Sequence, residues 1–314
     1  MQPGNMKHIY SPFLLALAAL LVVGCGQTDE SPEAVQDAEI ADPEQRPDRT
    51  PLVEGPRSPE GLQAILGTGD LGVGVNRVGF VITSPDGFVV EPEVTVTTSY
   101  RTRPDSPGEV KETVQAELQP WPYGNRGLYV AQLEFDHAGD WGLGIAVGER
   151  MVQLFFEVLD SPSAVAVGEL AVASKTRTFA DVESIEQLTT GSLGDPDFYQ
   201  ITLAEAVQSG DPTVVVFASP AFCTNAVCGP QVEVLQELKD EYAGQASFIH
   251  VDFYDNPDEI QGDLDRARIS PVVLEWGLPS IEWTFVIDRE GIVSDRFEGF
   301  ATYAEVEDAL KRVL

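Results

Sequence analysis

The 314-residue sequence predicts a multidomain protein in which an all-β antiparallel sandwich is followed by an α/β domain. Two observations carry this prediction. Short apolar or alternating segments separated by Gly, Pro and Asp turns fill residues 66–160, a spacing typical of a sandwich. From residue 199 onward the pattern becomes a buried strand, a helix, a second buried strand, a two-stranded hairpin and a terminal helix.

The first 25 residues have the pattern of a lipoprotein signal peptide. A short basic start at Met6–His8 precedes an apolar core over residues 12–23, which is shorter than the roughly 20 residues that a membrane-spanning helix requires. The core ends in Leu21–Cys25, which resembles the lipobox at which bacterial and archaeal lipoproteins are cleaved and diacylated. The resemblance implies a lipid on Cys25 and a position on the extracytoplasmic side of the cell membrane. The alternatives are an uncleaved hydrophobic anchor and a signal peptide in which the cysteine occurs by chance.

Residues 26–65 are predicted to form a disordered, acidic tether, because they combine several prolines with hardly any aliphatic periodicity. The whole chain is acidic as well, with a formal net charge of -32 and a pI near 4.1. Nucleic acids and anionic lipid surfaces are bound through basic patches, so neither is expected as a partner.

The segment from 66 to 160 contains five candidate strands, at residues 74–82, 94–98, 114–118, 128–135 and 152–158. Gly127–Ala131 is similar to the tyrosine-corner stretch of immunoglobulin-like domains, with Tyr129 in the place of the tyrosine. This resemblance implies an immunoglobulin-like β-sandwich. Trp141 is expected in the core or capping an edge of this domain rather than contacting a ligand. Only His137 and Met151 offer soft metal ligands in this segment, and they lie on different predicted elements, so no metal site is expected.

A connector is predicted over residues 161–198. Its patches at 165–167 and 170–172 are too apolar for a freely exposed linker, so we expect the connector to lie along the following domain. A short helix should follow, with Thr202 as its N-cap and Gly210 as its stop.

Residues 199–314 are predicted to form the α/β domain. The expected elements are strands at 212–219, 246–252, 283–288 and 292–297, a helix that begins near Pro230 and a terminal helix over 303–314. This order closely resembles the thioredoxin fold, as do three shorter stretches: Tyr242–Gly244, Val251–Pro257 and Phe297–Phe300.

Cys223 and Cys228 lie between the first strand and the first helix of this domain. If Cys25 carries lipid, they are the remaining thiols in an oxidising compartment and should form a disulfide. Within one continuous helix their Cα atoms would be at least about 7.5 Å apart, so residues 224–227 must bulge out as a loop. The thioredoxin resemblance implies a redox-active pair, since the positive end of a helix stabilises a thiolate. Which thiol is the better nucleophile stays open.

Several departures from the thioredoxin pattern favour a purely structural disulfide instead. Active thioredoxins have two residues between the cysteines, where this chain has four, and a buried acid on the preceding strand, where this chain has the apolar run 214–217. The position of the family's cis-proline falls at Glu282, and the nearest proline, Pro279, lies three residues earlier. Glu282 and Trp283 are therefore predicted to form the substrate-facing loop, where a carboxylate opposes a neighbouring thiolate.

Together these observations predict a membrane-anchored, extracytoplasmic protein that exchanges thiols and disulfides with protein partners in the cell envelope through Cys223 and Cys228. No cofactor and no metal is expected. The alternative is a redox-inactive interaction or structural lipoprotein in which the same disulfide only stabilises the fold.

Overall fold

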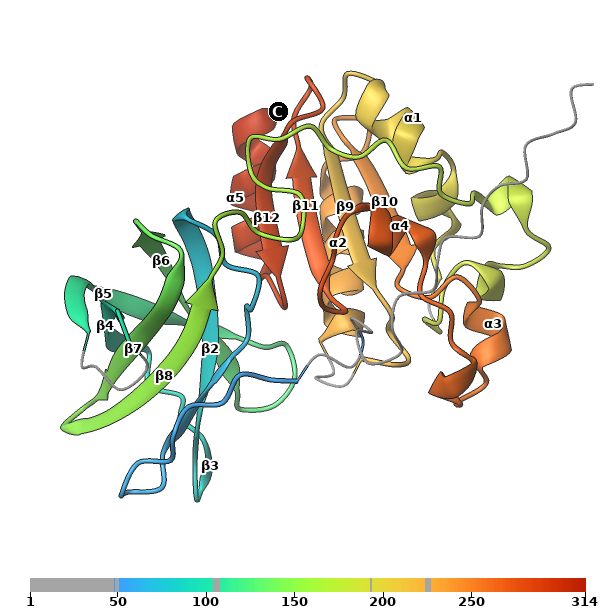
Figure 1. Ribbon diagram of the computed structural model, residues 1–314. Helices are drawn as coiled ribbons and strands as arrows, with labels where there is room; N and C mark the ends of the chain where they lie inside the picture. The colour runs from blue at the N-terminus through green and yellow to red at the C-terminus, as the bar shows by residue number, and fades with distance from the viewer. Residues whose placement is uncertain (1–47, 49–50, 104–107, 193, 224–226) are drawn as a thin grey trace, which may run out of the picture. The chain divides into compact units, whose positions relative to one another are not determined.

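The computed structural model describes residues 48, 51–103, 108–192, 194–223 and 227–314 (Figure 1). The predicted signal peptide with Cys25, and most of the predicted tether, lie outside these residues. None of the helices in the described part of the chain is long and apolar enough to cross a membrane.

The larger of two sheets has eight strands in the order β1-β2-β6-β5-β4-β7-β8, with β3 paired to β2. Each strand is antiparallel to its neighbours. The strands are β1 (Gln63–Leu66), β2 (Gly74–Ser84), β3 (Gly87–Phe88), β4 (Glu93–Tyr100), β5 (Glu109–Pro120), β6 (Gly127–Phe135), β7 (Gly139–Val147) and β8 (Arg150–Val158). Because β1 also contacts β8, the two end strands approach each other and the sheet is nearly closed, like a barrel.

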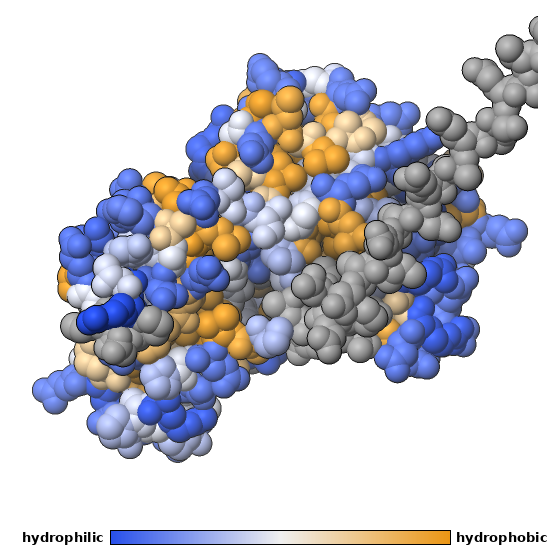
Figure 2. Space-filling view, in the orientation of Figure 1, coloured by the Kyte–Doolittle hydropathy of each residue, from blue (hydrophilic) through white to orange (hydrophobic). Residues whose placement is uncertain are grey.

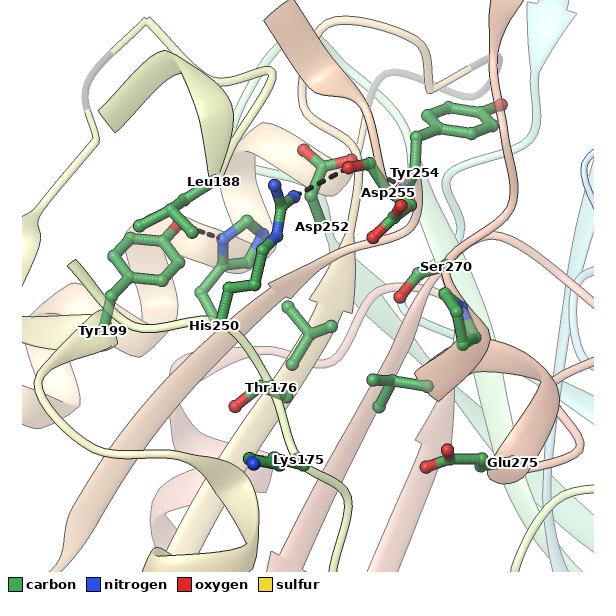
Figure 3. Close-up of a pocket in the computed structure, with 14 residues that line it drawn as sticks. Lys175, Thr176, Leu188, Tyr199, His250, Asp252, Tyr254, Asp255, Ser270 and Glu275 are labelled. Atoms are coloured by element: carbon green, nitrogen blue, oxygen red, sulfur yellow. Dashed lines mark hydrogen bonds between the residues drawn. The ribbon is translucent and has the colours of Figure 1, made fainter. Parts of the chain in front are cut away.

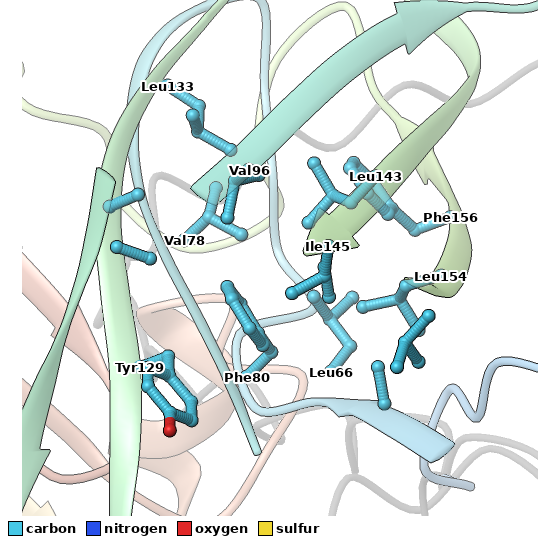
Figure 4. Packing of buried hydrophobic residues seen from close by; sticks show 14 of the residues in the cluster. Leu66, Val78, Phe80, Val96, Tyr129, Leu133, Leu143, Ile145, Leu154 and Phe156 are labelled. Carbon is cyan, nitrogen blue, oxygen red and sulfur yellow. The ribbon is translucent and has the colours of Figure 1, made fainter. Parts of the chain in front are cut away.

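Alternate side chains of these strands fill the inside of the curved sheet, as the period of two residues in a strand requires. Figure 4 shows side chains from several strands meeting in this core, among them Phe80, Tyr129 and Ile145. The rings of Phe80 and Tyr129 stack with their centroids 5.6 Å apart. Trp141 is fully buried in the same core, which confirms the core position expected for it.

The smaller sheet has four strands in the order β10-β9-β11-β12. They are β9 (Thr213–Ala218), β10 (Ser247–Asp252), β11 (Trp283–Ile287) and β12 (Val293–Glu298). β10 is parallel to β9, whereas β11 is antiparallel to both β9 and β12. All six residues of β9 are buried, because this central strand is covered on both faces.

Helices cover both faces of the smaller sheet (Figure 1). The longer ones, α2 (Cys228–Glu241) and α5 (Tyr303–Val313), pack with Val214 and Val216 of β9. The opposite face, with Val215 and Phe217, packs against the short helices α1 (Leu203–Gln208) and α4 (Pro271–Glu275). A further short helix, α3 (Pro257–Ile260), follows β10.

The predicted fold class, an immunoglobulin-like sandwich followed by an α/β thioredoxin-like domain, is wrong. The strands of the first region form one nearly closed sheet, whereas an immunoglobulin-like domain has two facing sheets. The described residues contain twelve strands and only five α-helices, of which α1, α3 and α4 have six residues or fewer. Residues 42–314 also form one compact unit rather than several. The protein is therefore mostly β, with two sheets in one unit.

The tyrosine that suggested an immunoglobulin-like domain has a different role. In a tyrosine corner the hydroxyl bonds to the backbone a few residues upstream. Here the Tyr129 hydroxyl donates to the carbonyl oxygen of Glu91, 38 residues earlier, at 3.0 Å. Tyr129 thus ties β6 to the segment before β4.

Two arginines join the two sheets. Arg77 of β2 donates to the Glu305 carboxylate of α5 and to the Phe300 carbonyl, both at 2.9 Å. Arg296 of β12 forms a 3.0 Å ion pair with Asp70, whose side chain is 1% exposed. The Asp70 carboxylate also accepts hydrogen bonds from two backbone N–H groups of the connector, at residues 163 and 164.

The connector lies along the smaller sheet, as predicted, although Val167 and Leu170 of its apolar patches stay exposed. Its backbone pairs with the outer edge of β12: the Gly168 N–H donates to the Val293 carbonyl and the Val293 N–H donates to the Glu169 carbonyl.

The face drawn in Figure 2 shows patches of hydrophobic residues among hydrophilic ones. Among the described residues, Val75 and Leu170 are the most exposed of the aliphatic side chains, at 71% and 70%.

Candidate functional site

Cys223 and Cys228 form a disulfide, as predicted. Cys223 follows the end of β9, and Cys228 is the first residue of α2, so only one of the two belongs to the helix. Their Cα atoms are 5.9 Å apart, within the range for a disulfide and shorter than one continuous helix would allow. The loop predicted at 224–227 falls mostly on residues 224–226, which are outside the described part of the chain.

The two sulfur-bearing residues differ in their surroundings. Cys228 is fully buried in the core between α2 and the sheet, whereas Cys223 is only half-buried. The backbone N–H of Cys228 donates to the sulfur of Cys223 at 3.3 Å. Because that N–H belongs to the first turn of a 14-residue helix, the positive end of the helix is directed at Cys223.

Glu282 immediately precedes β11, and its side chain reaches the disulfide. One carboxylate oxygen lies within 4.8 Å of both sulfur atoms. The residue is 2% exposed, so the carboxylate and the sulfurs share an environment that contains little water. The structure therefore brings Cys223, Cys228 and Glu282 together.

Trp283 is buried as deeply as Glu282. As the first residue of β11 it is fully buried. Its ring stacks on Phe285, and the guanidinium of Arg296 lies over it at 5.2 Å. Glu282 lies beside the sulfurs, and neither of the two residues predicted for a substrate-facing loop is exposed.

Asp252, the last residue of β10, was missed by the sequence analysis. Its buried carboxylate accepts hydrogen bonds from the backbone N–H and the hydroxyl of Thr190, at 2.6 and 2.9 Å. The Thr190 hydroxyl also pairs with Ser219 and accepts from the backbone N–H of Ala221, two residues before Cys223. Asp252 therefore helps to fix the backbone that leads to the disulfide. In the sequence, the only sign of this role is that Asp252 is an acidic residue at the end of an apolar strand.

A cavity of about 150 Å³ lies beside this network (Figure 3). At one end of the cavity the Tyr199 hydroxyl and Nδ1 of His250 form a hydrogen bond of 2.5 Å. Ser270 and Glu275 lie on the opposite side of the cavity. The ring of Tyr254, another lining residue, contacts Phe222, the neighbour of Cys223.

Burial changes the proton affinities of three groups at the cavity. It lowers the pKa of His250 to about 4 and raises the pKa of Asp252 to about 6, because each charged form loses its hydration. Burial also raises the pKa of Tyr199. At neutral pH His250 and Tyr199 are therefore neutral.

No protein-family model matches the sequence, and no curated protein is detectably similar to it. The chemistry of the disulfide and its neighbours is therefore the basis for assigning a function.

Proposed function

We propose that this protein exchanges thiols and disulfides with protein partners in the cell envelope through Cys223 and Cys228. A second part of the proposal is that a lipid on Cys25 anchors the chain to the membrane on its extracytoplasmic side. Cys223 is the sulfur that partners reach, and Cys228 is the resolving sulfur.

The exchange has two steps. A partner's thiolate attacks the Cys223 sulfur, so that a new S–S bond joins the partner to Cys223 while the Cys223–Cys228 bond breaks. Cys228 leaves as a thiolate and takes up a proton. The partner's second thiolate then attacks the mixed disulfide, which leaves Cys223 reduced and the partner oxidised. In the reverse direction the Cys223 thiolate attacks a partner's disulfide and Cys228 resolves the product.

The observation that supports this proposal best is the asymmetry between the two sulfurs. Cys223 is half-buried, and the N–H of Cys228 at the start of α2 donates to its sulfur. A donor and a helix N-terminus both stabilise a thiolate on Cys223, which makes Cys223 the leaving group when the mixed disulfide is resolved and the nucleophile in the reverse direction. Cys228, fully buried, is shielded from intermolecular attack.

Trapping of mixed disulfides tests the assignment of roles. Cys228→Ser should accumulate a covalent complex with partner proteins, because the resolving thiol is gone, whereas the matched variant Cys223→Ser should accumulate none. Equilibration with glutathione buffers gives the reduction potential, which we expect above about -300 mV. A lower potential together with no trapped complex in either variant would establish the alternative, a redox-inactive lipoprotein with a structural disulfide.

The membrane anchor is tested separately. Cys25→Ala should abolish incorporation of labelled fatty acid and release the protein from the membrane fraction, since a diacylated cysteine is its anchor in this proposal. Cys223→Ser serves as the control, because it removes a cysteine without affecting acylation. A Cys25→Ala protein that still incorporates label contradicts the anchor.

A further inference from the structure

The two sulfurs of the disulfide and the Glu282 carboxylate lie close together, and after reduction all three could bind a metal ion. The sulfurs of Cys223 and Cys228 and one carboxylate oxygen of Glu282 all lie within 4.8 Å of one another. Among the described residues this is the only set of three or more His, Cys, Asp or Glu side chains placed so closely. Cys228 and Glu282 are buried, and Cys223 is half-buried.

We propose that the reduced protein binds one Zn²⁺ ion through the thiolates of Cys223 and Cys228 and the carboxylate of Glu282. This inference rests on the proposed function only for the reductant in the cell, a partner's dithiol; metal binding itself requires only that the disulfide be reduced. Oxidation of the pair to the disulfide removes two of the three ligands, so metal binding and the disulfide exclude each other.

The two sulfurs need to move only a little to reach the separation that a zinc site requires. Tetrahedral Zn²⁺ with Zn–S bonds of about 2.3 Å places two sulfurs about 3.8 Å apart. Reduction releases the S–S bond and lets the sulfurs separate to that distance. Cys228 is held in the core at the start of α2, so the half-buried Cys223 provides most of the movement.

Charge also favours a cation at this position. Two thiolates and a carboxylate carry three negative charges, and burying such a group is costly without a compensating positive charge. A divalent ion reduces the net charge of the site to -1. Each thiol gives up a proton when the metal binds, so the affinity should rise with pH.

The donor set selects the metal. Thiolates disfavour Mg²⁺ and Ca²⁺, which take oxygen ligands, whereas Zn²⁺ accepts both sulfur and carboxylate oxygen. Cu(I) is a soft ion that the two thiolates satisfy without Glu282. Three protein ligands leave the fourth tetrahedral position of Zn²⁺ open to water or another donor.

The first step, reduction of the disulfide, requires a reductant. In the cell envelope a partner's dithiol becomes a disulfide and supplies the two electrons and two protons that convert the S–S bond into two thiols. In the test, a water-soluble phosphine replaces it, becoming a phosphine oxide with the oxygen of one water molecule, whose two hydrogens go to the sulfurs.

In the experiment the full chain is reduced under nitrogen in detergent and titrated with Zn²⁺. A chromophoric chelator competes with the protein for the metal and reports how much Zn²⁺ the protein binds. The chain carries Cys25→Ser, so that Cys223 and Cys228 are its only cysteines. We expect one Zn²⁺ per reduced chain and none per oxidised chain. Glu282→Gln should weaken binding at least about tenfold, since even the loss of groups outside the coordination shell costs roughly 10–100-fold. Cys223→Ser should weaken it further.

Glu298→Gln is the matched control, because Glu298 is a half-buried acid of the same sheet whose carboxylate accepts hydrogen bonds from Ser280 and the Asp70 N–H. Its zinc affinity should equal that of the parent. Circular dichroism checks the fold of each variant. X-ray absorption of the parent chain, which needs no variant, should show two sulfur neighbours at about 2.3 Å and oxygen neighbours near 2.0–2.2 Å. Failure of the reduced parent to bind, an unchanged affinity in Glu282→Gln, or four sulfur neighbours would each overturn the proposal.

Discussion

Glu282 places a carboxylate beside both sulfurs. Its carboxylate is within 4.8 Å of both of them and is shielded from water. A negative charge at that distance opposes ionisation of a neighbouring thiol, and the surrounding protein screens it poorly. An ionised Glu282 would therefore lower the reactivity of the reduced pair, and a proton or a cation would relieve this effect.

Replacing the carboxylate with an amide of the same shape tests this effect. In metal-free, reduced Glu282→Gln protein, the midpoint of the pH dependence of alkylation by iodoacetamide should fall by roughly one pH unit or more. The reason is the loss of like-charge repulsion at the thiolate. Glu298→Gln, which leaves the sulfurs unchanged, should alkylate like the parent. An unchanged or higher midpoint in Glu282→Gln contradicts the electrostatic role of Glu282.

At this scale the sequence predicted part of the site. The position of Glu282 beside the disulfide followed from aligning a single strand, at Trp283, whose boundaries are local features. Asp252 could not be recognised, because its importance comes from hydrogen bonds to Thr190, 62 residues away. Such a contact depends on how the connector folds back over the sheet, which a local pattern does not encode.

Strand β10 carries two buried titratable residues on the same face, His250 and Asp252, because they are two positions apart. Asp252 has a pKa of about 6, above its unfolded value of 3.8, so its contribution to stability is present below about pH 4 and lost as the pH rises to 6. His250 has a pKa of about 4, below its unfolded 6.5, so its contribution is present above pH 6.5 and lost as the pH falls to 4. The two effects oppose each other.

Removing either residue should reveal the other's pH dependence. Asp252→Asn should lose stability on acidification from pH 6.5 to 4 by on the order of 2–3 kcal/mol more than the parent, because the opposing effect of Asp252 is gone. His250→Gln should show the reverse trend. Urea unfolding at several pH values in this window measures both. If the two variants share the parent's pH profile, the pKa values of these groups do not differ between the folded and unfolded states.

Individual elements were more predictable than their pairing. The strands expected at 246–252 and 283–288 correspond to β10 and β11, because buried strands have continuous apolar runs. β7 was missed, because Gly139, Gly142 and Gly144 resemble turn residues although the residues between them alternate correctly. The near closure of the larger sheet depends on contact between β1 and β8, about ninety residues apart in the sequence, and no local signal specifies it.

Across the whole molecule, the two sheets are joined by the ion pair of Arg296 and Asp70. Asp70→Ala removes the carboxylate partner of a largely buried guanidinium, which keeps only its hydrogen bonds to backbone carbonyls, and leaves two backbone N–H groups without their acceptor. We expect a loss of roughly 3–5 kcal/mol in the free energy of unfolding. Asp86→Ala, in the exposed turn between β2 and β3, should cost less than about 0.5 kcal/mol. Urea unfolding followed by circular dichroism measures both, and a cost below about 1 kcal/mol for Asp70→Ala would show that the ion pair contributes little.

The pairing of the connector with β12 has a consequence for self-association. A strand at the edge of a sheet presents unpaired N–H and C=O groups on which the strand of another molecule can add, and such addition starts aggregation. Here Gly168 and Glu169 take up the outward-facing groups of Val293, and the Ala171 N–H binds the Gly291 carbonyl. The chain thus occupies this part of its own sheet edge. At high protein concentration, another molecule can add a strand at this edge only if the connector first dissociates from β12.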